Sequence, residues 1–392
     1  MRRIGSRRVL APHHRFRADT SDLLHQASFG FALPPPWGSG IADRAHLESP
    51  CLNAFSPRPA AATAPDPRIL VRELGSYREP SMSRSVIELV ITVVPFVALW
   101  ALMLFTLKAG YMAGLLLALP AGLFLLRLFL IQHDCGHGAF FAKRAANDWT
   151  GRILGVLTCT PYESWRRAHA LHHAGTGKLE ARGIGDIDTL TVAEYRALTP
   201  ARRALYRLYR HPLVLFGIGP AYMFLLRQRL PLGSLKCSRS LWVSALGTNL
   251  AIAASAGLLG WLVGFKLLLL VHLPITLVAA VIGVWLFYVQ HQFEHTVWDG
   301  EEKWSFHEAA LYGSSHYELP PVLRWFSANI GIHHVHHLVS RIPFYRLSEV
   351  VRDLPELGEM SRITLRDGFR CVGLVLWDED KRRLVSFAQA RA

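Results

Sequence analysis

The stretch IELVITVVPFVALWALMLFTL occupies residues 87–107 and carries a single charged side chain, Glu88. At 1.5 Å per residue, a helix of this length covers about 30 Å, which is the thickness of the hydrocarbon core of a membrane. A second apolar stretch of similar length follows at residues 111–131, after only residues 108–110. The two stretches predict a tight hairpin of membrane-spanning helices, in which Arg127 snorkels to the interface.

A second pair of apolar stretches lies at residues 241–265 and 267–290, separated only by Lys266. It predicts another hairpin of two spans. Residues 212–226 (PLVLFGIGPAYMFLL) are also apolar, but they are fewer and include Pro220. Their length favours an interfacial or re-entrant segment over a full crossing.

Four crossings place the N-terminus, residues 132–240 and the C-terminal region on the same side of the membrane. These regions carry nearly all of the Lys and Arg, whereas the short loops opposite carry only Lys108 and Lys266. By the positive-inside rule, the larger side and both termini are cytoplasmic. This placement accounts for much of the formal net charge of +14 without a nucleic-acid partner. The mean hydropathy of +0.22 is likewise typical of a membrane protein.

The composition divides the chain into three parts. Residues 1–65 are basic and rich in Pro and Ala, which predicts a disordered tail, or residues added by an upstream start codon. Residues 66–360 contain the four spans and form the expected catalytic domain, and residues 361–392 form a cytoplasmic tail. The five cysteines are scattered and without CxxC spacing, so they favour free thiols over a disulfide framework or a zinc site.

The histidines recur at spacings that bring side chains onto one face of a helix, three or four residues apart. The motifs are HxxxH at His133 and His137, HxxHH at His169, His172 and His173, HxxxH at His291 and His295, and HxxHH at His333, His336 and His337. One such pair is weak evidence of a metal site. Four motifs that all lie at one face of the membrane are much stronger evidence.

These histidines are too many for a single zinc ion, which takes about three or four protein ligands. They fit two metal ions that share the ligands and keep positions open. Imidazole suits several transition metals, of which iron is the redox-active ion best matched to oxygen chemistry. The predicted fold is therefore an all-α integral membrane protein. Its two helical hairpins are capped by a cytoplasmic helical domain that holds a histidine-ligated di-metal site.

Four segments at these motifs carry a resemblance to a known family. They are HDCGHGAFF at 133–141, PYESWRRAHALHH at 161–173, FYVQHQFEHTVW at 287–298 and NIGIHHVHHLVSRIPFYRL at 329–347. In these segments and their order, the chain resembles the membrane fatty acid desaturases over roughly residues 66–360. It is most similar to the bacterial and plastid-type branch that introduces Δ12 (ω-6) or ω-3 double bonds.

The resemblance implies roles for individual residues. The implied iron ligands are His133, His137, His169, His172, His173, His295, His333, His336 and His337. The family uses a histidine before the third histidine motif, and His295 is the best match for it. His291, Asp134 and Glu294 are then candidates for water-mediated or supporting contacts. His334 falls between ligand positions and is not expected to bind metal.

The resemblance also implies an activity. Two iron ions would activate O₂ so that two hydrogens are removed from a fatty acyl chain, leaving a cis double bond. The substrate would be an acyl lipid or thioester in the bacterial inner membrane. No fused electron-transfer motif is present, so a separate ferredoxin or cytochrome b5-like donor is expected.

Other readings remain open from the sequence. A lipid or hydrocarbon hydroxylase on the same scaffold would share the oxidant. A non-enzymatic metal transporter would need ligands within the spans, whereas here the histidines gather at one face. A membrane-tethered nucleic-acid binder is disfavoured, because no interleaved aromatic and basic patch accompanies the charge.

Overall fold

The computed structural model describes residues 67–183, 185–231 and 238–391. The predicted tail at 1–65 lies outside these residues. Four long helices, α2 (Met82–Lys108), α3 (Ala118–His137), α9 (Arg239–Val263) and α10 (Phe265–His291), dominate the molecule. Each is long and apolar enough to cross a membrane, and the span ending in α3 begins at Met112 with the 3₁₀ helix η2 (Met112–Leu117). The prediction of four spans in two hairpins is therefore confirmed.

Local signals set the ends of these helices. The Ser81 side chain accepts a hydrogen bond from the backbone N–H of Arg84 and caps the start of α2. Gly138 has a φ of 68° and ends α3 directly after His137. Gly264 has a φ of 90° and makes the turn between α9 and α10. Positive φ values suit glycine because it lacks a Cβ atom.

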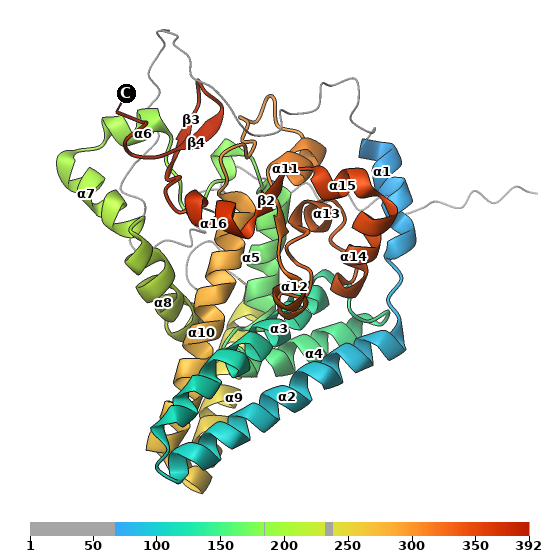
Figure 1. The fold of residues 1–392 in the computed structure, drawn as a ribbon, viewed down its shortest axis with the longest axis vertical. Helices are drawn as coiled ribbons and strands as arrows, with labels where there is room; N and C mark the ends of the chain where they lie inside the picture. Colours follow the sequence, from blue (N-terminus) through green and yellow to red (C-terminus); the bar gives the residue numbers. More distant parts are fainter. Residues whose placement is uncertain (1–66, 184, 232–237, 392) are drawn as a thin grey trace, which may run out of the picture.

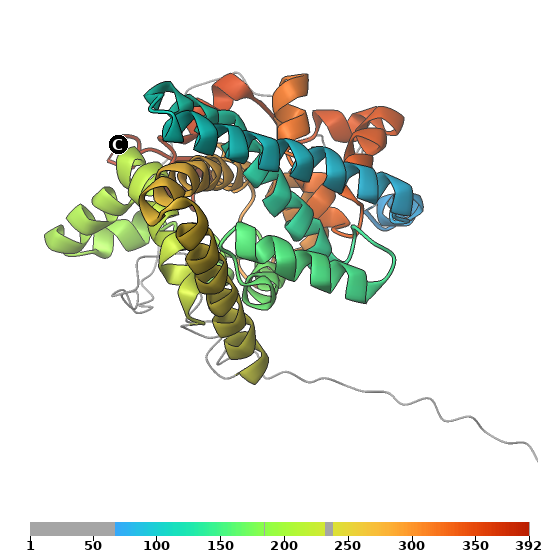
Figure 2. The same cartoon turned by 90° about the horizontal axis from the view of Figure 1, so that it is seen from below.

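The centre of the bundle is the contact between α3 and α10. A Cβ atom at Gly122 of α3 would lie 2.5 Å from Val278 Cγ1 of α10, so glycine permits this close approach. Helix α2 contacts both α3 and α10, and α9 contacts α10. Figure 2, seen from below, shows α9 inclined away from the other three spans. Apolar side chains such as Phe105 and Leu250 are exposed on the outer faces, where lipid would lie.

A buried ion pair joins the first two spans, which corrects the prediction for Arg127. Arg127 Nη2 lies 2.5 Å from Glu88 Oε2, and both side chains are almost fully buried. The guanidinium also donates to the carbonyl of Trp325, and its Cζ lies 4.0 Å from the centre of that ring. Arg127 does not snorkel to the interface, because it has an acidic partner inside the protein.

The remaining elements lie mostly above the long helices in the view of Figure 1. The α-helices are α1 (Pro67–Glu73), α4 (Arg144–Leu157), α5 (Tyr162–Gly175), α6 (Val192–Ala197), α7 (Pro200–Tyr209), α8 (Gly219–Leu225), α11 (Phe306–Tyr312), α12 (Pro321–Phe326), α13 (His333–Leu338), α14 (Phe344–Asp353), α15 (Pro355–Glu359) and α16 (Leu365–Cys371). Shorter turns are the 3₁₀ helices η1 (Leu74–Tyr77), η3 (Leu179–Ala181) and η5 (Arg227–Arg229), and the π-helix η4 (Leu213–Ile218).

The apolar segment at 212–226 does not form a fifth long helix. It contains η4 and the seven residues of α8, and it is not among the four candidate spans of the described chain. Leu213 and Ile218 are exposed on it. These features agree with a segment that follows the membrane interface.

The C-terminal residues that we expected as a tail are folded against the rest of the chain. Strand β2 (Arg362–Thr364) pairs in parallel with β1 (His316–Glu318). Strands β3 (Leu376–Asp378) and β4 (Arg383–Val385) form an antiparallel hairpin. Buried residues of this hairpin pack with Tyr195 of α6 and Tyr206 of α7 in a second hydrophobic core.

Candidate metal centre

Helices from four parts of the chain bring nine histidines together. Helix α3 ends at His137 and α10 ends at His291, so both spans deliver histidines at the point where they stop. Helices α5 and α13 carry the two HxxHH motifs and lie beside these ends. The nine histidines form two groups, each of which could hold a metal ion.

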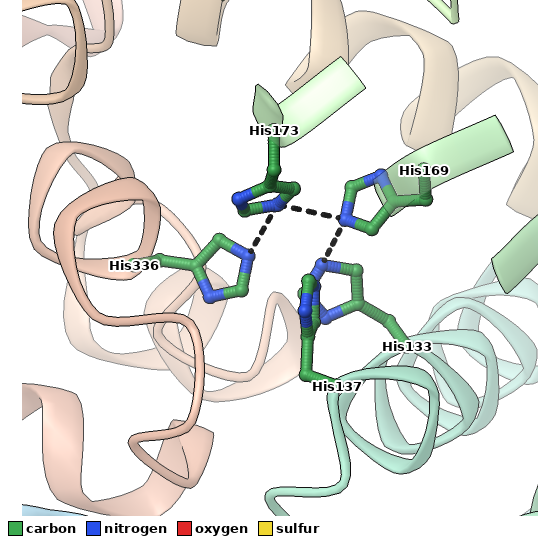
Figure 3. Close-up of side chains that lie close together, drawn as sticks. All are labelled: His133, His137, His169, His173 and His336. Carbon is green, nitrogen blue, oxygen red and sulfur yellow. Dashed lines mark hydrogen bonds between the residues drawn. The ribbon is translucent and has the colours of Figure 1, made fainter. Parts of the chain in front are cut away.

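The first group contains five histidines: His133 and His137 of α3, His169 and His173 of α5, and His336 of α13. Their ligand nitrogens all lie within 4.8 Å of one another. Figure 3 shows the five rings converging from the three helices. The Nε2 atom of His169 lies 3.0 Å from that of His133 and 3.0 Å from that of His173. His336 Nε2 lies 3.2 Å from His173 Nε2.

The second group contains four histidines: His172 of α5, His291 of α10, and His333 and His337 of α13. All four are buried. The Nε2 atom of His291 lies 3.1 Å from that of His172 and 3.0 Å from that of His333. His337 Nε2 lies 3.1 Å from His333 Nε2.

Neighbouring histidines on one helix belong to different groups. On α5, His173 points to the first group and His172 to the second, and on α13 His336 and His337 divide in the same way. Adjacent side chains on a helix diverge by about 100°, so they cannot easily share one ion. The HxxHH spacing therefore builds two adjacent sites. The His173 and His337 rings, one from each group, stack with centroids 4.0 Å apart.

The distances between nitrogens fit a metal ion in each group. Imidazole nitrogens bind a first-row metal such as zinc at about 2.0–2.1 Å, so two ligands at a right angle would lie about 3 Å apart. The Nε2 pairs are 3.0–3.2 Å apart, for example between His169 and His173 or between His336 and His173. A tetrahedral angle would separate them by about 3.4 Å. The spacing thus leaves room for one first-row metal ion in each group.

The chemistry of the side chains also fits a metal. His137 Nε2 is buried within the first group and has no hydrogen-bond partner in the described chain. Burial and the neighbouring imidazoles hold the pKa of His173 and of His336 well below the usual value. Burial does the same for His172 and His333. These rings are therefore neutral at physiological pH, which is the form that binds metal.

Polar groups behind the rings orient two of the histidines. Asp134 Oδ1 lies 3.4 Å from His133 Nδ1, and Asp134 Oδ2 accepts a 2.7 Å hydrogen bond from the backbone N–H of Phe344. His291 Nδ1 lies 3.3 Å from the carbonyl oxygen of Gly313. In metal sites such contacts fix the ring and leave Nε2 free to bind.

The structure differs from the sequence prediction at His291 and His295. It places His291 inside the second group and His295 outside both groups, exposed in a turn. The HxxxH prediction required the helix to continue through residue 295, but α10 ends at His291. The chain leaves the helix at Gln292, whose side chain accepts hydrogen bonds from Thr189 and Arg210.

Two other residues singled out by the sequence lie away from both groups. Glu294 forms an ion pair with Arg383 at 3.0 Å, so it supports the C-terminal hairpin instead. His334 is buried and its Nε2 lies 2.7 Å from the carbonyl oxygen of Leu357. Neither belongs to a metal-binding group of the described residues.

The comparisons with known proteins agree with this geometry. The family model for fatty acid desaturases matches residues 109–369. A fatty acid desaturase of Bacillus subtilis is 41% identical over 318 residues, which cover 81% of this chain and 90% of that protein.

The chain belongs to the fatty acid desaturase family. It is an oxidoreductase and an integral membrane protein with four candidate spans.

More distant relatives are named more narrowly. The sn-1 acyl-lipid omega-3 desaturase (ferredoxin) of Synechocystis is 30% identical over 60% of this chain and 66% of its own length. The sn-1 oleoyl-lipid 12-desaturase of the same organism is 29% identical over 63% of this chain and 73% of its own. The desaturase is thus similar to enzymes that differ in the position of the double bond.

A small apolar pocket of about 20 Å³ lies among α3, α8 and α10 of the desaturase. Its lining consists of Leu125, Leu126, Phe129, Thr158, Phe224, Thr276, Ala279, Ala280 and Gly283. Phe129 contacts the Trp165 ring at 5.5 Å between centroids. Trp165 in turn stacks on His169 at 4.7 Å. Phe129 and Trp165 therefore connect the lining of the pocket to the first histidine group.

Several residues around the centre carry little signal in the sequence. Trp165 lies four residues before His169, which places it on the same helix face, but a tryptophan near a membrane boundary is also typical of an interfacial anchor. The small residues Ala279, Ala280 and Gly283 looked like ordinary parts of a span. Gly283 follows Ala279 by four residues and Ala280 by three, so the three residues lie on one side of the helix. That spacing alone does not reveal a pocket.

Proposed function

We propose that this desaturase introduces a cis double bond into a fatty acyl chain in an O₂-dependent reaction, with Δ12 (ω-6) regiospecificity. The observation that carries the proposal is the pair of histidine groups beside an apolar pocket of the membrane bundle. An acyl chain is apolar and its methylenes are inert. A site for its oxidation needs a redox metal and a dry channel that fixes one carbon.

We assign one iron ion to each histidine group. The first would be held by His133, His137, His169, His173 and His336, and the second by His172, His291, His333 and His337. When bound, the two ions would supply the oxidising power that removes two hydrogens from the acyl chain. The all-nitrogen ligand sets and their 3.0–3.2 Å spacings support a transition-metal ion at both positions, and membership of the desaturase family supports iron.

The residues of the chain would then control geometry and water. The lining of the pocket offers carbon surface to the acyl chain, with Thr158 and Thr276 as its only hydroxyl-bearing side chains. Trp165, stacked on His169, would form the wall between the pocket and the first ion. Burial of the second group keeps bulk water from that ion.

Asp134 would act as a positioning residue for the first ion. Its carboxylate lies against His133 Nδ1 and also accepts the backbone N–H of Phe344. It therefore ties the end of α3 to the start of α14, just after the third histidine motif. Such a contact orients the imidazole and raises its basicity toward the metal.

Electrons would come from a separate donor. The name of one relative, which is 30% identical to this chain, specifies ferredoxin, and a ferredoxin-like protein is therefore the first donor to test. The ω-3 and oleoyl 12-desaturase names of the distant relatives support an acyl-lipid substrate. The positive-inside bias supports a bacterial inner membrane, with the site and both termini in the cytoplasm.

The catalytic unit would include the predicted domain at 66–360. The strand β2, which pairs with β1 in front of the third histidine motif, extends that unit into the C-terminal segment.

The test is gas chromatography–mass spectrometry of total fatty acids from bacterial cells that express the chain with a ferredoxin and its reductase. Cells that express His172→Ala provide the matched control. We expect a new dienoic acid with its second bond at Δ12, absent from the control. A hydroxylated product, or a wild-type profile that equals the control, would contradict the proposal.

A further inference from the structure

Arg210 is a buried cation at the end of α7 that the reaction as described does not use. It is 2% exposed. The carboxylates of Asp186 and Asp188 interact with it electrostatically, but among the described residues neither is hydrogen-bonded to its guanidinium. Burial alone would lower the pKa of its guanidinium, but the nearby hydroxyls of Tyr288, Tyr206 and Tyr209 raise the pKa overall, so the side chain stays charged. A buried charge of this kind must be compensated by hydrogen bonds.

The guanidinium donates five hydrogen bonds, all to neutral oxygens. Nη1 donates to the Asp188 carbonyl at 3.2 Å and to Thr189 Oγ1 at 2.9 Å. Nη2 donates to the Tyr288 hydroxyl at 3.2 Å, to Gln292 Oε1 at 3.2 Å and to the Leu374 carbonyl at 2.9 Å. Three separate segments of the chain therefore meet at one side chain.

Two of these segments lead directly to the second histidine group. Tyr288 and Gln292 flank His291 at the end of α10. The segment containing Thr189 begins at Gly185, where a Cβ atom would lie 3.1 Å from both His172 Cβ and the carbonyl oxygen of Ala168, so this loop packs on α5 over the turn that carries His172. Thr189 Oγ1 also lies 3.2 Å from Gln292 Oε1, which closes the network.

We propose that Arg210 is the positioning residue of the second metal site, because it fixes His172 and His291 relative to each other. The inference rests on the proposed assignment of one ion to each histidine group. None of the five histidines of the first group lies on α10, and none is next to Thr189 in the sequence. Loss of the guanidinium fork should therefore weaken one site and spare the other.

The experiment compares the full chain with Arg210→Lys, which keeps the positive charge but cannot reach five acceptors in a planar fork. Arg207→Met is the matched control. Arg207 lies on the same helix and contacts Tyr195 and Phe387, but makes none of the contacts with α10. Iron per chain and the Mössbauer spectrum are measured on protein purified in detergent and titrated with Fe(II).

We expect the second iron to bind about 10–100-fold more weakly in Arg210→Lys, with the spectrum of the other iron unchanged and Arg207→Met like wild type. Two irons with the wild-type titration and spectrum would overturn the inference. An equal loss of both irons would also overturn it, since that would indicate general unfolding. If Arg210→Lys is not recovered as folded protein, the double variant Tyr288→Phe and Gln292→Leu is used instead, because it removes two of the acceptors of Arg210. The inference again requires weaker binding of the second iron alone. A wild-type chain that binds no iron would refute the proposed function instead.

Discussion

The Nε2 atoms of His172 and His291 lie 3.1 Å apart, although the two residues are separated by 119 positions in the chain. One belongs to the second histidine motif on α5 and the other to the last residue of a membrane span. This contact joins α5 to the end of α10 at the second histidine group.

His291 and His295 should behave differently although they share one HxxxH motif. His291→Ala should remove one of the four nitrogens of the second group and abolish desaturation, with about one iron lost per chain. His295→Ala should keep iron and activity, because the side chain is exposed and outside both groups. Iron analysis and fatty acid profiles of both variants measure this. If His295→Ala lost iron and activity while His291→Ala kept both, His295 would be the metal ligand and this account would be contradicted.

Enlarging Gly283 should change the length of acyl chain that the enzyme accepts. A Cβ atom at this position would lie 3.5 Å from Leu126 Cδ1, an ordinary contact, so a larger side chain can enter the pocket without displacing the backbone. Gly283→Leu should lower kcat/KM for the longest substrates by about tenfold or more relative to shorter ones.

The matched control for the pocket is Gly247→Leu. Gly247 lies on α9, is exposed, and has nothing within 4 Å of its added Cβ. Chain-length selectivity measured with a series of acyl lipids should be unchanged in this variant. Equal selectivity in both variants would show that the pocket does not hold the substrate.

The iron-free enzyme should lose stability on acidification. The pKa values of His333, His336 and His337 lie well below the usual value in the folded state, chiefly through burial. In the unfolded chain they would be about 6.5. Below that pH the unfolded state binds protons that the folded state does not, so the free energy of unfolding falls. The slope is about 1.4 kcal/mol per pH unit for each histidine.

Melting temperatures of chelator-treated enzyme between pH 7.5 and pH 5 measure this effect, and His336→Leu should reduce the slope. Asp186 acts in the opposite direction, since burial raises its pKa to about 7 and its contribution to stability is lost as the pH rises toward that value. Asp186→Asn should therefore steepen the loss on acidification. If the melting temperature stays constant as the pH is lowered from about 6.5 to about 5, the account of neutral buried histidines is contradicted.

Breaking the ion pair between the first two spans should destabilise the bundle. Glu88→Gln leaves the Arg127 guanidinium buried without an acidic partner, which costs about 3–5 kcal/mol in comparable buried pairs. Glu79→Gln, at an exposed site just before α2, is the control. Thermal unfolding of the two variants in detergent should show a large decrease only for Glu88→Gln. Equal melting temperatures would mean that solvent or lipid compensates Arg127.

The sequence predicts those parts of the molecule that local patterns determine. The spans follow from runs of apolar residues, and the pairing of His169 with His173 or His333 with His337 follows from helical spacing. Both depend only on residues close together in the chain.

The remaining features depend on contacts between distant residues. The end of α10 at His291 is associated with the bonds of Gln292 to Thr189 and Arg210, so no local signal indicated that His295 would lie outside the helix. The partner of Arg127 lies in another helix. Likewise, the folding of the C-terminal segment depends on the pairing of β2 with β1, which spacing along the sequence does not reveal.

The most direct test of the central claim is the number of iron ions bound by the full-length protein purified in detergent. The account predicts about two irons per chain in the wild type. It predicts about one in His336→Ala and about one in His337→Ala, because these neighbours on α13 belong to different groups. A wild-type chain that binds a single metal ion, or two variants that lose the same ion by Mössbauer spectroscopy, would contradict the two-site centre.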